Sequence, residues 1–99
     1  MIKHIVMWNL AGDTKEDRRT AAEFLRSRFE ELRGEVPGLL HLEVGLDHSR
    51  VDYACDVVLY TEFESQEALD AYANHPAHLR VRDEFGQTRI ARFQVDYAL

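Results

Sequence analysis

The chain is 99 residues long, which suits a single domain spanning residues 1–99 and leaves no room for a second hydrophobic core. Its composition, 45% hydrophobic and 30% charged, excludes both a disordered chain and a membrane protein. The net charge of −6, with basic residues scattered among acidic ones, argues against a nucleic-acid partner, because phosphates are bound by clustered Lys and Arg.

The first two predicted elements are a strand and a long helix. Residues alternate from Ile2 to Leu10, which is the period of a β-strand. Gly12-Asp13-Thr14 breaks that pattern and offers a capping side chain for a helix. Apolar residues then recur at helical spacing from Ala21 to Val36, with Phe24 widening the apolar stripe, and Pro37-Gly38 completes the stop.

Two strands are predicted next. From Leu40 to Leu46 the even-numbered residues are apolar and the others mostly polar, which is typical of a half-buried strand. The polar segment from Asp47 to Arg50 forms a connection. From Tyr53 to Phe63 both alternating sets are largely apolar, so we expect a strand covered on both faces.

The last part of the chain predicts a broken helix and a final strand. Ser65 is placed to cap a helix whose inner face includes Leu69 and Tyr72. His75-Pro76 interrupts that helix, and Pro suits the first position of a renewed helical stretch. Strand-like alternation returns from Thr88 to Tyr97.

The predicted order β-α-β-β-α-β defines the fold class as α+β and ferredoxin-like, with a four-stranded antiparallel sheet and its helices on one face. The other face would be bare, although the first and third strands carry apolar residues on both sides. Because a contiguous exposed apolar face is rare on a soluble monomer, we expect two copies to pack sheet to sheet as a homodimer.

The single cysteine and the first residues bear on the cellular compartment. Cys55 cannot form an intrachain disulfide, and its position in a strand pattern favours a small core residue over a nucleophile. Residues 1–4 run directly into a strand and lack the apolar core and cleavage site of a signal peptide. We therefore expect a cytoplasmic protein.

Four stretches carry a resemblance to a known family. They are Ile2-Lys3-His4-Ile5-Val6, Val36-Pro37-Gly38, the segment from Phe63 through Tyr72 to His75-Pro76-Ala77-His78, and Val95-Asp96-Tyr97. Together they resemble the stress-responsive A/B barrel domains across nearly the whole chain, and the third stretch is the most specific. The resemblance implies a dimeric α/β barrel. It implies less about activity, because many bacterial members have no assigned reaction.

A plant member of that family is a polyketide cyclase that performs an intramolecular aldol condensation. The resemblance implies that Tyr72 and His78 match its active pair and that His4 lies in the pocket between the sheet and the helices. An imidazole can remove a proton from a carbon between two carbonyls, and a phenol can donate a hydrogen bond to the developing oxyanion. A cyclase-like enzyme, with His78 as base and Tyr72 as oxyanion donor, is therefore one candidate function.

The match to the plant enzyme has a gap. That enzyme has an additional pocket histidine where this chain has Asp56-Val57-Val58, so the pocket here is lined differently. A small hydrophobic ligand bound without turnover, or another carbon acid, is therefore also open. The candidate ligand-binding residues are His4, Trp8, Val57 and His75.

A structural interpretation stands beside both. His75 can cap the renewed helix, His78 can be a satisfied buried histidine, and Tyr72 can be a core aromatic residue. The domain would then be a dimerising structural or stress-protective module without a small-molecule site.

Metals and cofactors have weaker support. His75 and His78 are three residues apart, but Pro76 alters the helical geometry that would align them. Further potential ligands are His41, Glu43 and His48. Trp8 invites comparison with the cofactor-free monooxygenases among related dimeric barrels, but a Trp on the apolar face of a strand is more often a packing residue. We expect neither a metal nor a cofactor.

Overall fold

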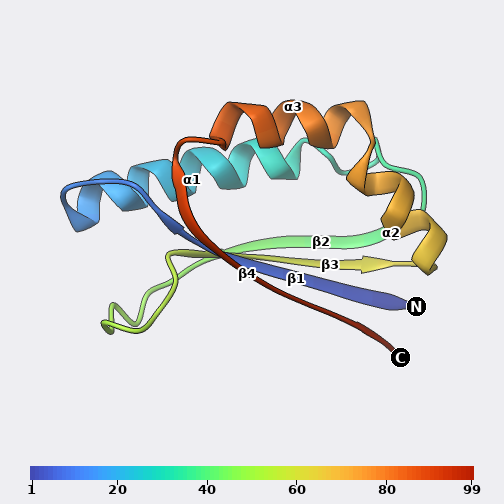
Figure 1. Ribbon diagram of the computed structural model, residues 1–99, viewed down its shortest axis with the longest axis horizontal. Coiled ribbons are helices and arrows are strands. Elements are labelled where there is room, and N and C mark those ends of the chain that lie inside the picture. Colours follow the sequence, from blue (N-terminus) through green and yellow to red (C-terminus); the bar gives the residue numbers. More distant parts are fainter.

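A computed structural model describes all residues from Met1 to Leu99 and shows two layers, a sheet and a set of helices (Figure 1). The predicted α+β fold, with its ferredoxin-like order of elements and four-stranded antiparallel sheet, is confirmed. The strands are β1 (Ile2–Leu10), β2 (Leu39–Leu46), β3 (Val57–Phe63) and β4 (Arg89–Ala98), and the helices are α1 (Lys15–Glu30), α2 (Gln66–Ala73) and α3 (Pro76–Phe85).

The strands lie in the order β2-β3-β1-β4, so that β1 and β3 are central and β4 forms one edge. Val6 of β1 is paired with Leu59 of β3 on one side and with Gln94 of β4 on the other. Because side chains alternate between the faces of a sheet, this register puts Arg92, Gln94 and Asp96 of β4 on the same face as the buried residues of β1.

The hydrophobic core fills the space between the sheet and the helices. From α1 it receives Ala22, Leu25 and Phe29, which are buried together with Leu42 and Val44 of β2. Burying a side chain the size of leucine stabilises a fold by roughly 1.5–3 kcal/mol, so this cluster holds α1 on the sheet. No helix has the length and apolar character needed to cross a membrane.

Caps define where the helices begin, as the sequence predicted. The hydroxyl of Thr14 accepts a hydrogen bond from the backbone N–H of Asp17, and that of Ser65 accepts one from the N–H of Ala68. His75 caps α3 through Nδ1, which accepts from the N–H of Ala77 at 3.1 Å, and Pro76 takes the first helical position. The predicted interruption between α2 and α3 is confirmed.

Two features of the first predicted helix were wrong. The helix ends at Glu30, and residues 31–35 form a turn in which Gly34 has a positive φ of 77°. Phe24 is exposed and does not belong to the buried stripe. Its ring instead contacts that of Phe85 of α3, 5.4 Å away between centroids, because α3 lies beside α1 in the same layer.

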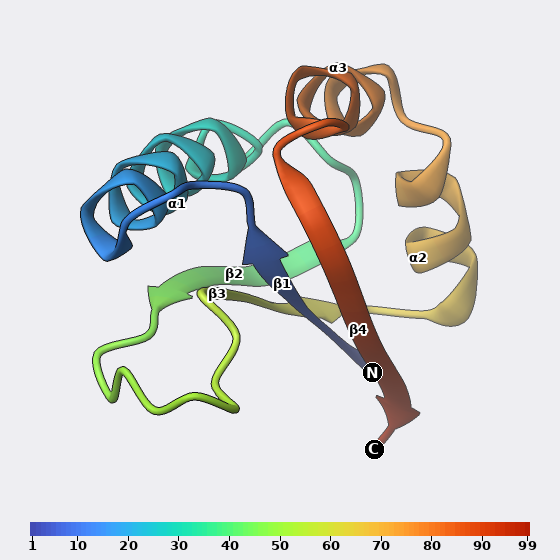
Figure 2. The ribbon, with the colours of Figure 1, turned by 60° about the vertical axis from the view of Figure 1, so that its left-hand side comes forward.

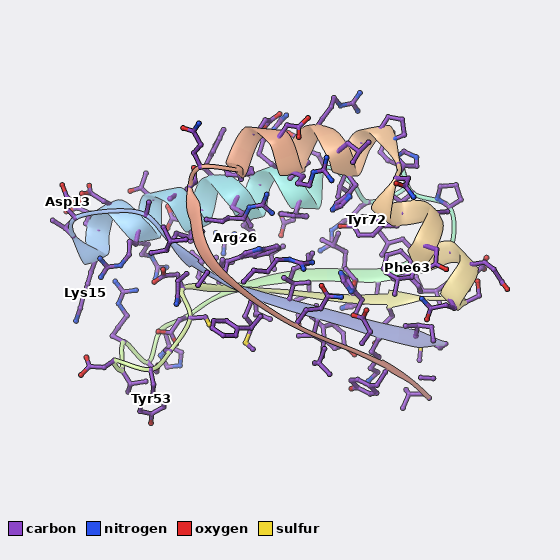
Figure 3. All side chains as sticks on the ribbon, viewed as in Figure 1. Asp13, Lys15, Arg26, Tyr53, Phe63 and Tyr72 are labelled. Carbon is purple, nitrogen blue, oxygen red and sulfur yellow. The ribbon has the colours of Figure 1, made fainter.

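Two strand predictions also need correction. Leu40 is exposed because the pairing of β2 with β3 shifts register between Leu39 and His41, so that Leu39 packs against the core in its place. Tyr53 is 91% exposed, since β3 begins only at Val57 and the preceding residues form a loop that extends away from the helices (Figures 2 and 3).

The face of the sheet away from the helices is uncovered (Figures 1 and 2). We call it the open face and define it by its exposed large hydrophobic residues, which are Met7 of β1 and Phe93, Val95 and Tyr97 of β4. Register places all four on the same side, because Met7 is paired with Phe93. The apolar face inferred from the sequence is therefore present.

Candidate functional site

A cavity of about 360 Å³ lies on the helix-facing side of the sheet, where residues of β1, β3 and β4 meet α1, α2 and α3. Its apolar wall is formed by Val6, Trp8, Phe29 and Leu59. Its polar groups come from three histidine and tyrosine side chains, His4, Tyr72 and His78, and from three arginines. This volume is within the range of pockets that bind small molecules.

The break between the helices creates the centre of the site. Tyr72 lies near the end of α2 and His78 in the first turn of α3, so the chain reversal at His75-Pro76 brings the two side chains together. Their ring centroids are 4.3 Å apart. Figure 3 shows Tyr72 in the layer between the helices and the sheet.

The phenol of Tyr72 is buried and its hydroxyl has no hydrogen-bond partner in the protein. Its ring packs against that of Phe63, with centroids 5.1 Å apart, which fixes its direction. Burial raises the pKa of Tyr72 well above its ordinary value, although the positive charge of Arg92 opposes that effect. The hydroxyl therefore stays protonated at neutral pH and is available as a donor.

The imidazole of His78 is partly buried. Its Nδ1 lies 3.3 Å from the carbonyl oxygen of Ala73, and since a carbonyl can only accept, we assign the proton of the neutral ring to Nδ1. Burial lowers the pKa of His78, the hydrogen bond to Ala73 opposes this effect, and the charges of Arg82 and Arg89 act in the same direction as burial. At neutral pH this leaves an uncharged ring whose Nε2 can accept a proton.

A second histidine of the cavity is held by a carboxylate. Nδ1 of His4 lies 2.6 Å from Oδ1 of Asp96, its partner across β1 and β4. Because a carboxylate accepts, Nδ1 is the donor, and Nε2 of His4 is left for other contacts. Gln94 donates to the other oxygen of Asp96 at 2.9 Å. This role of Asp96 was not predicted from the sequence, because it follows only from the register of the two strands.

Trp8 lines the cavity with its ring stacked on that of Phe29, 5.5 Å away between centroids. Its Nε1 is buried and has no partner in the protein. The Trp8 nitrogen and the Tyr72 hydroxyl are the only two buried side-chain polar atoms of the chain in that condition, and both residues line this cavity. Buried donors are normally paired, so two unpaired ones beside one cavity are unusual.

The structure brings together four of the six residues that the sequence analysis selected: Tyr72, His78, His4 and Trp8. Val57 is buried and lines a different hollow, beneath the loop between β2 and β3. His75 does not line the cavity, and its Nδ1 is used by the cap of α3. No three His, Cys, Asp or Glu side chains are grouped closely enough to hold a metal ion.

Three arginines that also line the cavity were not predicted from the sequence: Arg82, Arg89 and Arg92. Arg82 is on α3, and the other two are on β4. Alternation along β4 was visible in the sequence, but which of its faces would meet the helices was not. That face became known only from the pairing of Trp8 with Arg92.

The fold and the cavity define a ferredoxin-like α+β protein with a pocket between its sheet and its helices. The family model of the stress-responsive A/B barrel domain matches residues 2–99, so the chain belongs to that family. No curated protein shows significant similarity to this sequence.

Solved structures share the fold over nearly the whole chain. A dimeric protein of unknown function from Bacteroides fragilis matches with a TM-score of 0.86 and 26% identity, over 99% of this chain and 95% of that one. A dimeric ferredoxin-like protein from Thermobifida fusca matches with a TM-score of 0.83 and 20% identity, over 99% and 90%. A hydroxynitrile lyase from Passiflora edulis matches with a TM-score of 0.79 and 16% identity, over 99% and 92%. At 20% identity and below, such a match shows the fold alone.

Proposed function

We propose that this protein is a homodimer, joined through the open face, that binds a small apolar molecule in the cavity beneath α2 and α3. The observation that carries the binding function is the pair of unpartnered buried donors, Trp8 Nε1 and the Tyr72 hydroxyl. Leaving a buried donor unpaired costs about 1–3 kcal/mol, so a ligand that offers an acceptor to either group gains part of that energy.

The open face supports the dimer. It carries Met7, Phe93, Val95 and Tyr97 exposed on two neighbouring strands, and apolar patches of this kind mark interaction surfaces. The related proteins from Bacteroides fragilis and Thermobifida fusca are described as dimeric. An isologous contact would cover the same patch on both copies.

The dimer is tested by sedimentation of two matched variants. Phe93 on the open face and Phe24 on α1 are similarly exposed, at 53% and 56%. Phe93→Lys should shift the protein toward monomer at micromolar concentration, whereas Phe24→Lys should sediment as the wild type does. A wild-type protein that remains a folded monomer contradicts the proposal.

Ligand binding is tested with a small aromatic compound and with variants that fill, or leave open, the cavity. A small aromatic carbonyl compound, such as acetophenone, should bind in a calorimetric titration and should protect the protein against thermal unfolding, raising the melting temperature in proportion to its occupancy. Filling the cavity by Ala73→Leu should abolish both effects, while Ala71→Leu, on the exposed side of α2, should retain them. Equal protection in both variants would rule out this cavity as the binding site.

A second candidate function is acid-base catalysis of an intramolecular aldol cyclisation. It is favoured by the neutral His78 imidazole beside a protonated, unpartnered phenol. Nε2 of His78 would take a proton from the carbon between two carbonyls of the substrate. That carbon would then attack a further carbonyl of the same substrate molecule. The Tyr72 hydroxyl would donate a hydrogen bond to the resulting alkoxide, and His78 would return its proton to that oxygen to give a β-hydroxy ketone. The new hydroxyl then leaves together with the remaining proton of the attacking carbon, as water, which forms the C=C bond of the condensation product.

This reaction is tested with a linear β-polyketide thioester mimic and detection of the cyclised product. His78→Ala should lower the rate by about 10²–10⁴-fold, and Tyr72→Phe by about 10²–10³-fold. His41→Ala, which removes an exposed histidine of β2, is the matched control and should keep the wild-type rate. Cyclisation no faster than in buffer would contradict the catalytic function and leave the binding function standing.

A further inference from the structure

Three arginines distinguish this cavity from a neutral apolar pocket. Arg82, Arg89 and Arg92 all line it, and no Asp or Glu side chain does. Arg82 and Arg92 are exposed and Arg89 is partly buried, so the positive charge is concentrated at the entrance. The protein has a net charge of −6, so this local excess of cations is opposite to its composition.

These charges are poorly neutralised by the protein itself. The guanidinium of Arg92 makes no hydrogen bond and no ion pair with any other residue. Arg82 has only its neighbour Asp83, at 3.7 Å and exposed to solvent. Like charges that share a site repel one another, and an anion bound between them would relieve that repulsion.

Arg89 is held in place as a binding group. Its Nε donates to the carbonyl oxygen of Phe85 at 3.3 Å, and its Nη2 donates to that of Arg82 at 3.0 Å. The guanidinium carbon lies 5.7 Å from the ring centroid of Trp8, within cation–π range. Neither carbonyl carries a formal charge, so the orientation of Arg89 is fixed while its charge is left for a ligand.

The positive charges also act on the two groups at the centre of the cavity. Against the dominant effect of burial, Arg92 lowers the pKa of Tyr72. Arg82 and Arg89 add to the burial that lowers the pKa of His78. An anionic group bound at the entrance would therefore interact electrostatically with Tyr72 and His78.

We propose that the ligand of this cavity is a small apolar monocarboxylic acid whose carboxylate binds Arg89 and Arg92 and whose hydrocarbon part lies against Val6, Phe29 and Leu59. This inference rests on the proposed binding function and names the chemical class of its ligand. A planar guanidinium matches a carboxylate in two parallel hydrogen bonds, which gives Arg an advantage over Lys at such a site. In a keto acid bound this way, the carbonyl carbons would extend toward Tyr72 and His78.

The test is calorimetric titration of the intact protein with three compounds of one shape: 3-phenylpropionate, its uncharged amide, and 2-phenylethyl phosphate. The carboxylate should bind at least about tenfold more tightly than the amide, the difference expected for a charge-assisted hydrogen bond. Arg92→Gln should weaken carboxylate binding about tenfold and leave amide binding within twofold. Arg80→Gln, which removes an exposed arginine of α3 outside the cavity, should change neither.

The outcomes distinguish a wrong ligand class from a wrong binding site. Equal affinity for acid and amide, or carboxylate binding unchanged in Arg92→Gln, would overturn the acid while preserving the pocket. Tighter binding of the phosphate than of the carboxylate would overturn the choice of a carboxylic acid. Failure of all three compounds to bind the wild type would contradict the binding function itself. Because the Arg92 side chain has no hydrogen bond or ion pair to lose, its variant should fold, and its circular dichroism spectrum and melting temperature verify this.

Discussion

The helix-facing side of the sheet has two halves that use the same layer of side chains differently. Over β2, α1 packs so closely that Leu25 of α1 and Leu42 of β2 are essentially inaccessible to solvent. Over β4, the residues that face the helices, Arg92, Gln94 and Asp96, are exposed. Close packing in the first half stabilises the fold. The second half contains the cavity, with its unpaired donors and positive charges, next to that packed core.

This contrast explains why the candidate site lies where it does. Removing atoms from a closely packed region lowers the free energy of unfolding, so such a region has little room for a ligand or for unpaired polar groups. The half beside β4 carries two unpaired buried donors and a cluster of like charges, which cost stability in the free protein. Sites that reduce stability in this way are characteristic of binding and catalysis.

The largest effect is expected in the packed half. Leu25→Ala should lower the free energy of unfolding by about 2–5 kcal/mol, because it removes a fully buried side chain and leaves a cavity. Chemical denaturation measures the change. Leu40→Ala, at an exposed leucine of β2, is the matched control and should stay within about 0.5 kcal/mol of the wild type. Similar losses in the two variants would remove the distinction between the halves.

A smaller loss is expected from the polar contact that supports the site. Asp96→Ala leaves Nδ1–H of the buried His4 without its acceptor, and should cost about 1–3 kcal/mol in the free energy of unfolding. Asp70→Ala, which removes an exposed carboxylate of α2, should have little effect. An unchanged stability in Asp96→Ala would mean that the His4–Asp96 contact is not formed in solution.

Tyr72→Phe should change stability in the opposite direction. It removes a buried hydroxyl that has no partner and keeps the ring that packs on Phe63, so the free protein should gain about 1 kcal/mol. Tyr60→Phe is the control, because the Tyr60 hydroxyl donates to Glu62 at 2.6 Å and should not yield a gain when lost. A loss of stability in Tyr72→Phe would show that the hydroxyl is paired in solution.

The smallest effect concerns pH. The folded protein lowers the pKa of His78, so below about pH 6.5 the unfolded chain binds a proton more readily than the folded one. The unfavourable effect of His78 on the free energy of unfolding is absent above that pH. It grows progressively as the pH falls through the lowered pKa. Denaturation of wild type and His78→Gln should therefore run parallel above pH 7 and diverge toward pH 5, where the wild type loses more. Parallel behaviour throughout would place His78 in solvent.

The fold could be predicted from the sequence because its signals are local. The alternation of Ile2 to Leu10, the cap at Ser65 and the break at His75-Pro76 each depend on neighbours within a few residues. The errors arose where pairing overrides local pattern. The register shift beside Leu40 cannot be read from alternation, and Tyr53 lies in a loop although its surroundings resemble a strand.

The site was only half predictable, for a related reason. Tyr72 and His78 lie six positions apart in one broken helix, so the sequence placed them together with little long-range information. Arg92 reaches the same cavity, and Asp96 reaches its residue His4, through the pairing of β1 with β4 across more than eighty residues of chain. Sequence thus determined the elements, their order and the residue types at the helix break. Only the tertiary structure decided which face of β4 meets the helices, because a one-residue change in strand register would send all its side chains to the opposite side.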